Sequence, residues 1–219
     1  MNKTRQRRRT SRIFIESAAE IIREEGIDAL TIRKVADIAA YNSATLYNYF
    51  ENLDHLKSLS ALIFIKDYTD NLDEEIKDCA NAYEINEKIW LFFYRHTYRK
   101  PDIFYSIFGK SVNKAHNSYI NDFYDIFPEH LSVQSDKVRG MIVEENLFDR
   151  TMFLLKQCAA EDYFAYEDLE EIYELIFFIY QGMLNKLLAC PTCMTEDEFV
   201  EKAKAYNNRI FDTYKKRPN

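Results

Sequence analysis

The amino-acid sequence predicts an all-α protein, because it is poor in the residues that punctuate β-structure and its apolar residues recur at helical spacing. Glycine and proline number only four each in 219 residues, whereas folds rich in strands and loops use both freely. No stretch alternates apolar and polar residues for the length of a strand, and no fixed-period repeat is present. With 47% apolar and 30% charged residues, the composition indicates a globular chain.

Three short helices are predicted in the first fifty residues, over residues 13–25, 32–39 and 43–50. A stripe of apolar residues that starts at Phe14 marks the first helix, and Gly26 is placed to end it. Thr31 and Asn42 are placed to cap the second and third helices. The first fifty residues therefore predict a small three-helix domain.

The rest of the chain predicts longer helices, over residues 54–76, 85–99, 101–109, 147–159, 169–189 and 196–214. Pro101 suits a first helical turn, and Thr195 with Glu198 forms a capping box for the last helix. Residues 110–135 are the least periodic part, so we expect a passage that is partly helical and partly loop.

Charge is divided unevenly along the chain. Residues 1–57 hold ten basic and eight acidic residues (net +2), whereas residues 58–219 hold nineteen basic and twenty-eight acidic residues (net −9), and the whole chain has a net charge of −7. No acid precedes Glu16, and the cations before it are Lys3, Arg5, Arg7, Arg8, Arg9 and Arg12. Such an arm suits nucleic-acid phosphates, and a disordered solubilising tail is the alternative.

The sequence predicts a cytoplasmic protein. Its longest apolar run, from Leu175 to Tyr180, is far shorter than the roughly 18 residues that cross a bilayer. No apolar segment of a secretion signal follows the basic N-terminus. Four cysteines are too few for a disulfide scaffold in a chain of this length.

The second and third helices, with the tight connection over residues 39–42, form a helix-turn-helix pattern. This motif presents one helix to the major groove of DNA. Short helical pairs also occur in protein cores, so the bare pattern leaves that alternative open.

Three blocks of sequence make the DNA-binding interpretation specific, and they run from Phe14 to Gly26, from Leu30 to Ala36 and from Ala44 to Phe50. With these blocks, residues 14–57 resemble, without a gap, the DNA-binding region of the TetR family of transcriptional regulators. The resemblance implies a helix-turn-helix DNA-binding domain over residues 1–53, which includes the basic arm. It implies a larger helical domain for effector binding and dimerisation over residues 54–219.

The recognition helix needs a small polar leading end to approach the bases, and Asn42, Ser43 and Ala44 provide it. We expect Ser43, Tyr47 and Asn48 to read bases, because asparagine can pair with adenine through two hydrogen bonds. The full predicted DNA-binding set is Arg8, Arg9, Thr31, Arg33, Asn42, Ser43, Thr45, Tyr47, Asn48, Tyr49 and Lys57. Alternatively, Tyr47 and Tyr49 pack in the three-helix core, where we expect Leu46 and Phe50.

Three residues depart from the family pattern. Ala40 stands where the family commonly has glycine, so a positive φ there would cost strain. Tyr41 replaces a smaller aliphatic residue, and Leu53 stands where a lysine often meets a phosphate. The phosphate contact at Leu53 is therefore in doubt, and the basic arm is the expected substitute.

The sixteen Phe, sixteen Tyr and one Trp are concentrated after residue 63 and have two interpretations. They fill a core, or some line a cavity for a hydrophobic or aromatic small molecule, such as the effector that the resemblance implies. The candidate effector-binding residues are Trp90, Phe93, Tyr94, Tyr105, Phe108, Phe123, Phe148, Met152 and Phe177.

The helix over residues 169–189 is apolar on several faces, which indicates a partner helix and a homodimer. Gly182 lies inside it and suggests a close helix contact. The candidate interface residues are Ile172, Ile176, Ile179, Gly182, Met183 and Phe199. A fully buried central helix is the alternative.

Cys190-Pro191-Thr192-Cys193 is compatible with a plain loop, a redox pair or part of a metal site. No phosphate loop, nucleophile motif or histidine pair accompanies it, so we expect no enzyme activity, no cofactor and no metal site.

The sequence therefore predicts a ligand-responsive repressor that binds a palindromic operator as a homodimer and is released by a small hydrophobic or aromatic effector. The alternative is a helical, redox-responsive or small-molecule-binding protein without sequence-specific DNA binding.

Overall fold

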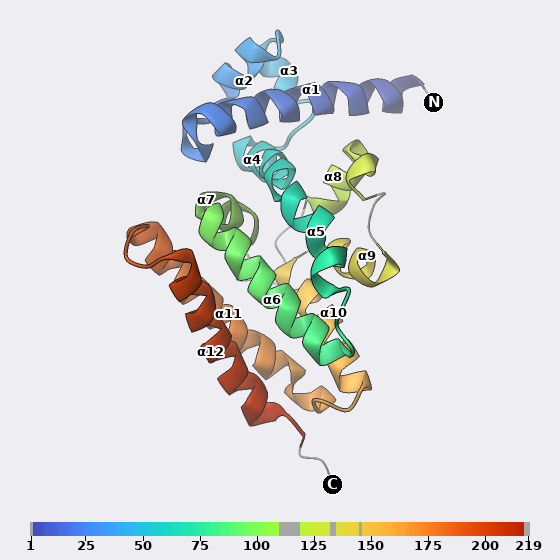
Figure 1. Cartoon of the computed structure of the whole chain (residues 1–219). Helices are drawn as coiled ribbons and strands as arrows, with labels where there is room; N and C mark the ends of the chain where they lie inside the picture. Colours follow the sequence, from blue (N-terminus) through green and yellow to red (C-terminus); the bar gives the residue numbers. More distant parts are fainter. Residues whose placement is uncertain (1, 110–118, 132–134, 145, 217–219) are drawn as a thin grey trace. The chain divides into compact units, whose positions relative to one another are not determined.

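The protein is helical throughout the part that the structure describes. The computed structural model describes residues 2–109, 119–131, 135–144 and 146–216, and every regular element within these ranges is a helix (Figure 1). The predicted all-α fold class is confirmed. The α-helices are α1 (Asn2–Glu25), α2 (Ile32–Ile38), α3 (Ser43–Leu46), α4 (Leu53–Leu62), α5 (Lys66–Ile76), α6 (Ala82–Arg99), α7 (Pro101–Phe104), α8 (Ile120–Ile126), α9 (Asp136–Ile142), α10 (Leu147–Ala160), α11 (Leu169–Ala189) and α12 (Glu196–Tyr214).

Short helical turns accompany the α-helices. The 3-10 turns are η1 (Ile27–Ala29), η2 (Ile63–Ile65), η4 (Pro128–His130) and η5 (Tyr166–Asp168), and η3 (Tyr105–Gly109) is a π-helix. None of the described helices is long and apolar enough to span a bilayer.

The chain divides into two compact units. Residues 1–67 and 117–133 form the N-terminal unit, and residues 68–116 and 134–219 form the C-terminal unit. The α8 segment therefore packs with the N-terminal unit although it follows α7 in sequence, and it contacts α1 and α4. This division by packing leaves the predicted division of functions at residue 53 as a prediction.

The core of the N-terminal unit forms around Phe14 of α1. Its ring lies edge-on to Phe50, with 6.0 Å between the ring centroids, and 5.0 Å from the ring of Tyr41. Phe14 and Leu46 are completely buried, and Phe50 is almost so. Burial of each such side chain contributes about 1.5–3 kcal/mol, so these contacts hold the short helices together. The predicted core roles of Leu46 and Phe50 are confirmed.

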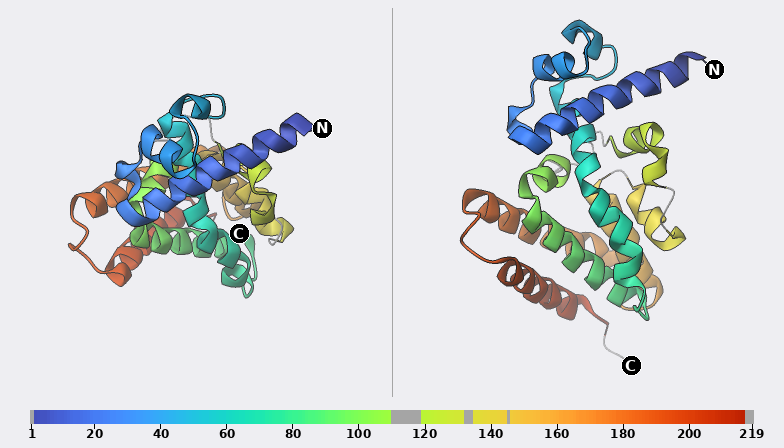
Figure 2. Two further views of the ribbon diagram at one scale, coloured as in Figure 1. Left: turned by 90° about the horizontal axis from the view of Figure 1, so that it is seen from above. Right: turned by 45° about the horizontal axis from the view of Figure 1, so that its top comes forward.

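Helix α6 forms the centre of the C-terminal unit and packs against α10 and α12, while α11 packs against α10 and α12. Helices α11 and α12 lie side by side in every view (Figure 2). The predicted capping box forms, since the Thr195 hydroxyl accepts from the Glu198 backbone N–H and the Glu198 carboxylate accepts from the Thr195 backbone N–H.

Helix α9 is absent from the sequence prediction. It has only seven residues and contains Gly140, which weakens a periodic signal. The glycine leaves room for the Phe153 ring, because a Cβ at this position would lie 2.6 Å from that ring as it is placed. Burial against α10 therefore stabilises a helix that local propensity does not predict.

The turn after α2 places Ala40 in a left-handed conformation. The Tyr41 N–H donates to the Ala36 carbonyl (2.9 Å) and the Ala40 N–H to the Asp37 carbonyl (3.3 Å), which together form a Schellman motif. The motif needs a positive φ at its central residue, and φ of Ala40 is 56°. The expected strain from the missing glycine is therefore present.

We expect Ala40→Gly to raise the free energy of unfolding by about 1 kcal/mol, because the left-handed cost of about 1–2 kcal/mol outweighs the added flexibility of glycine in the unfolded chain. Urea denaturation followed by circular dichroism measures this change. The matched control is Ala39→Gly, where φ is −70° and the substitution should destabilise the protein. Equal or lower stability of Ala40→Gly would show that the turn carries no strain.

Candidate nucleic-acid interface

Hydrogen bonds from two capping side chains fix the helix-turn-helix. The Thr31 hydroxyl accepts from the Lys34 N–H (3.3 Å) at the start of α2, and Asn42 Oδ1 accepts from the Ala44 N–H (2.8 Å) at the start of α3. Both caps are as predicted. The α-helical part of the third helix is shorter than predicted, because after Leu46 the chain continues to Phe50 as hydrogen-bonded turns.

The segment from Ser43 to Phe50, which we call the recognition segment, separates a buried face from an exposed one. Leu46 and Phe50 lie in the core, whereas Tyr47 is 59% exposed and Asn48 is also exposed. The alternative that Tyr47 packs in the core is therefore wrong. The hydrogen-bonding side chains of Tyr47 and Asn48 lie on the exposed face and do not take part in the core packing of Leu46 and Phe50.

Tyr49 combines packing with access. Tyr49 is half-buried, and its ring centroid lies 5.7 Å from that of Phe14. The Arg7 guanidinium lies 5.4 Å from the centroid of the Tyr49 ring. The neighbouring predicted contacts are placed as follows: Thr31, Arg33 and Asn42 are exposed, and Ser43 and Thr45 are half-buried. These residues all lie on α2, on α3 or at their capping positions.

The basic arm is part of helix α1, which begins at Asn2. A disordered tail, the alternative for this region, is therefore wrong for the described residues. Arg8 and Arg9 are exposed, and a surface hollow of about 520 Å³ is lined by Arg5, Gln6, Arg8, Arg9, Arg12 and Ile126. Helical spacing places several guanidinium groups on one side of α1, as a phosphate contact requires.

Arg12 is held by contacts within the protein. It forms ion pairs with Glu16 (3.1 Å) and Glu129, and it lies over the Phe127 ring at 4.5 Å. The hydrogen bond with Arg12 lowers the pKa of Glu129 below its usual range. Arg12 therefore joins η4 to α1 and is poorly placed to meet a phosphate.

The start of α4 lacks a cation at the position of Leu53, which is half-buried. His55 does not substitute, because it is buried, its ring stacks on Tyr119 at 3.9 Å and its Nδ1 accepts from the Glu51 N–H. Burial lowers the pKa of His55, which favours the neutral imidazole. Lys57 is half-buried and remains the nearest predicted cation of α4.

The structure does not gather the predicted effector residues in one place. Phe93 contacts Trp90 (5.6 Å) and Phe108 (5.2 Å), and the ring of Tyr94 lies 5.7 Å from that of Trp90. Phe148 and Phe177 flank Tyr173 in a second cluster of the same unit. Met152 is buried in α10, and Tyr105 is half-buried in η3.

Phe123 belongs to a different unit from the other effector candidates. It lies in α8 of the N-terminal unit and stacks on Phe127 at 4.9 Å between ring centroids. Its aromatic character, the basis of the sequence prediction, serves the packing of the N-terminal unit.

Sequence reasoning missed the polar side chains buried beside Trp90. Asn86 is completely buried, and Tyr94 donates a hydrogen bond to Asn207 at 3.5 Å. Among the described residues, both side-chain polar atoms of Asn86, the Nε1 of Trp90 and the Nδ2 of Asn207 have no hydrogen-bond partner. Asn86 precedes Trp90 by one helical turn, and this spacing was the available signal.

The predicted interface residues differ in how much surface they leave for a partner. Ile172, Ile176 and Phe199 are completely buried within their own subunit, and Met183 is buried. Ile179 is half-buried and Gly182 is exposed. The helical stripe through Ile172 and Ile176 therefore faces the core of the C-terminal unit, but the alternative of a fully buried helix is wrong, because Phe178 of the same helix is exposed.

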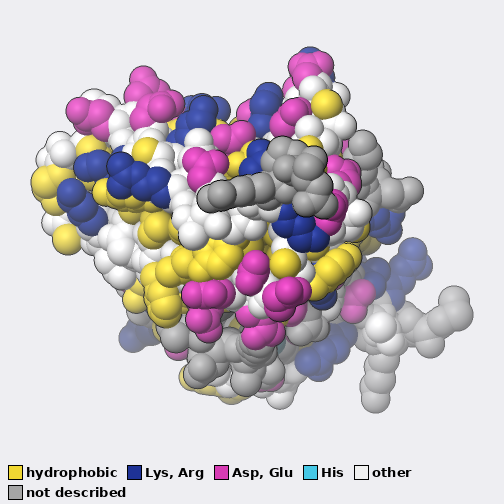
Figure 3. Space-filling view, turned by 90° about the horizontal axis from the view of Figure 1, so that it is seen from below, with side chains coloured by type: hydrophobic (Ala, Val, Ile, Leu, Met, Phe, Trp, Pro, Cys, Tyr) yellow, Lys and Arg dark blue, Asp and Glu magenta, His cyan; other side chains and the backbone are white. Residues whose placement is uncertain are grey.

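The other four predicted interface residues, Ile179, Gly182, Met183 and Phe199, line a groove beside an exposed face of α11. Phe178 is 65% exposed, and it lines a groove of about 290 Å³ between α11 and α12. The other lining residues are Ile179, Gly182, Met183, Lys186, Met194, Phe199, Lys202 and Tyr206. Hydrophobic side chains also form a band bordered by acidic side chains on one face of the molecule (Figure 3), so exposure alone does not define an interface.

Comparison with known proteins agrees with this geometry. Residues 14–56 match the model of the family described as bacterial regulatory proteins, tetR family. A search of curated protein sequences found no match. The family match covers the capped helices and the recognition segment described above.

Solved structures of similar fold extend over almost the whole chain. A protein from Mesorhizobium loti assigned to the TetR family is 12% identical, with a TM-score of 0.57 over 95% of this chain and 98% of that one. A TetR family transcription regulator from Marinobacter aquaeolei is 15% identical, with a TM-score of 0.50 over 99% and 100%. The fatty acid degradation regulator FadR from Bacillus halodurans is 14% identical, with a TM-score of 0.53 over 92% and 94%.

At these identities the solved structures establish the fold, and the family match establishes the DNA-binding region. Neither comparison points to a family of enzymes. Residues 14–56 therefore belong to the family described as bacterial regulatory proteins, tetR family, and contain its helix-turn-helix DNA-binding region, while the chain as a whole shares the fold of the solved structures.

Proposed function

We propose that this protein is a ligand-responsive repressor that acts in the cytoplasm, binds a palindromic operator as a homodimer and is released by a small hydrophobic or aromatic effector. One observation supports the DNA-binding role above all others. Tyr47 and Asn48 are exposed while Leu46 and Phe50 anchor the same segment in the core. Recognition of DNA bases requires exposed hydrogen-bonding side chains that are held in place by a rigid core.

The roles along the interface follow from chemistry and exposure. Asn48 offers a donor and an acceptor to adenine, and Tyr47 and Ser43 offer hydroxyl groups. The proposed phosphate contacts are Arg8, Arg9, Thr31, Arg33, Thr45, Tyr49 and Lys57, with Asn42 at the leading end. Residues 1–53 hold all of these contacts except Lys57.

We expect Asn48→Ala to reduce discrimination between the operator and unrelated DNA by a factor equivalent to about 1–3 kcal/mol, because it removes a base contact. Fluorescence anisotropy with DNA that flanks the protein's own gene measures the two affinities. Unchanged discrimination would contradict the assignment of Asn48 to base reading.

Arg9→Ala should instead weaken binding to all DNA sequences alike and reduce the slope of log affinity against log salt by about 1, since it removes a phosphate contact. The matched control is Arg209→Ala, an exposed cation of α12 in the C-terminal unit. Equal slopes for Arg9→Ala and wild-type protein would contradict the assignment of Arg9 on α1 to a phosphate contact.

The groove between α11 and α12 supports dimerisation through a second copy of the same surface. Phe178 projects from it, and a Cβ added to Gly182 would meet nothing within 4 Å. Gly182 therefore has no packing role within its subunit, and open space beside a helix backbone suits close approach of another helix. A two-fold dimer presents two recognition segments to successive major grooves, which gives the operator its palindromic form.

We expect Phe178→Asp to convert the dimer to a monomer at micromolar concentration, because it places a charge in the proposed interface. Light scattering after size exclusion measures the mass. The side chain is mostly exposed in the protomer, so the subunit should still fold. The control is Tyr166→Asp, which changes an aromatic residue of similar exposure outside the groove. A monomeric wild-type protein would refute the dimer.

The buried polar atoms beside Trp90 support an effector site in the C-terminal unit. Burying a polar group without a hydrogen bond costs about 1–3 kcal/mol, so retention of Asn86 in an aromatic core needs a benefit. An aromatic effector with hydrogen-bonding groups would satisfy Asn86, Trp90 and Asn207. The effector would bind one dimer geometry more tightly than the other, by a free-energy difference that is typically about 1–3 kcal/mol. This preference would favour the geometry that does not fit the operator, so the DNA would be released.

We expect Asn86→Leu to stabilise the effector-free protein by about 1 kcal/mol or more, because it replaces an unpaired buried amide by an apolar group of similar size. Urea denaturation measures the change. Asn207→Leu is the contrasting variant, since it removes the hydrogen bond from Tyr94 and should bring no such gain. Destabilisation by Asn86→Leu would show that the amide is satisfied within the native core and argue against the effector site.

A further inference from the structure

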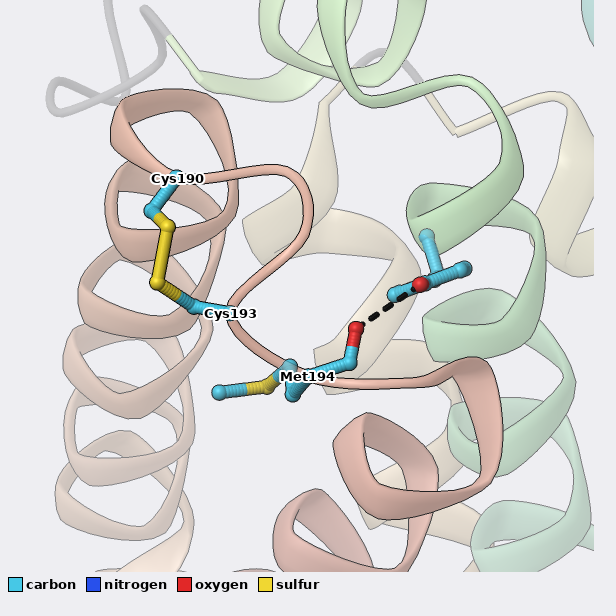
Figure 4. Close-up of a disulfide and its surroundings, with 4 residues drawn as sticks. Cys190, Cys193 and Met194 are labelled. Carbon is cyan, nitrogen blue, oxygen red and sulfur yellow. Dashed lines mark hydrogen bonds between the residues drawn. A yellow bond between two sulfur atoms is a disulfide. The ribbon is translucent and has the colours of Figure 1, made fainter.

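The connection between α11 and α12 is closed by a disulfide between Cys190 and Cys193 (Figure 4). Cys190 ends α11, where its N–H donates to the Lys186 carbonyl at 3.0 Å. The Cys193 N–H donates to the Cys190 carbonyl at 3.2 Å, so the four residues form a tight turn. Pro191 restricts that turn further, because its ring fixes φ.

The residue after the disulfide belongs to the α11–α12 groove. Met194 lines the groove with Phe178 and Phe199. Its carbonyl accepts a hydrogen bond from the Tyr98 hydroxyl at 2.8 Å, which joins the loop to α6 (Figure 4). The state of the disulfide is therefore coupled by one peptide bond to a residue of the groove wall.

The start of α12 is fixed independently of the disulfide. The Thr195 capping box closes its first turn, and Arg99 donates to Glu196 through two nitrogens at 2.7 and 3.0 Å. Opening of the disulfide would therefore leave α12 in place and release only the turn that links Cys190 to Met194.

The two paired cysteines differ from the two free ones in access. Cys193 is exposed and Cys190 is half-buried, whereas Cys158 is buried and Cys79 is half-buried. Burial raises the pKa of Cys158 to about 12 and also raises that of Cys79, so both thiols are poor nucleophiles at neutral pH. The accessible sulfur chemistry of the chain is thus concentrated in the α11–α12 turn.

We propose that Cys190 and Cys193 are a redox-active pair that exchanges with low-molecular-weight thiols and disulfides of the glutathione class, and that oxidation holds Met194 in the groove wall. The consequence for dimer affinity rests on the proposed use of this groove as the dimer interface. The exchange itself does not depend on that function.

The chemistry balances with an external thiol as the only reductant. A thiolate attacks the exposed Cys193 sulfur, the bond between the two protein sulfurs breaks, and Cys190 leaves as a thiolate that takes a proton from water. A second external thiolate attacks the external sulfur of the mixed disulfide and releases Cys193. Two electrons enter the protein, one external disulfide forms, and the reverse sequence oxidises the pair.

The exchange is tested with the full-length Cys79→Ser/Cys158→Ser variant in buffers of defined ratios of reduced to oxidised glutathione. Intact mass after thiol alkylation should show both remaining cysteines titrating together in one two-electron transition. In the same background, Cys190→Ser should accumulate a mixed disulfide between Cys193 and glutathione. A pair that remains unreacted across the full range of ratios would overturn the proposal.

The coupling to the groove is tested by hydrogen exchange, a measurement that does not require dimerisation. Peptides that cover residues 190–195 should exchange faster in the reduced protein than in the oxidised one, and Cys190→Ser/Cys193→Ser should match the reduced protein under both conditions. Equal exchange in the two states would overturn the role of the disulfide in holding Met194.

Analytical ultracentrifugation then measures the effect on assembly. We expect reduction to weaken dimerisation about 5-fold or more, a typical coupling between sites. Equal dissociation constants for oxidised and reduced protein would overturn this consequence. A wild-type protein that is monomeric in both states would refute the proposed dimer, while the glutathione titration would still decide the exchange.

Discussion

The burial of Leu46 and Phe50 beneath the recognition segment is the constraint on which the DNA-binding site depends. These residues are four positions apart, so Tyr47 and Asn48 between them turn away from the core around Phe14, while Tyr49 packs at its edge. Tyr47 and Asn48 are exposed for that reason. The same packing that stabilises α2 and α3, which are too short to persist alone, therefore creates the surface that we propose to face a duplex.

The aromatic core of the C-terminal unit also encloses polar atoms that have no hydrogen-bond partner among the described residues. Around Trp90, rings fill the space between α6 and α11, yet several hydrogen-bonding atoms among the described residues are left without a partner. A core optimised for stability alone would hold apolar side chains there. The unsatisfied amide of Asn86 and the strained turn at Ala40 each lower the stability of the fold locally. We propose that the effector binds beside Asn86.

Helices with strong local signals could be predicted from the sequence, and those without could not. Thr31, Asn42 and Thr195 cap helices as their positions indicate. Helix α9 was missed because packing against Phe153 of α10 stabilises it rather than its own spacing. The helical state of the basic arm was also undetermined, since a run of like charges does not distinguish a helix from a tail.

The fold class and the capped helix-turn-helix could be predicted from the sequence because both follow from spacing within about ten residues, and the family resemblance added the residues of the recognition segment. Long-range packing was needed to show which apolar residues of the later helices are buried. Ile172 and Ile176 face the core, Phe178 is exposed, and Phe123 packs in the N-terminal unit. An apolar stripe has the same spacing whether a core, a ligand or a partner covers it, so long-range packing must choose among them.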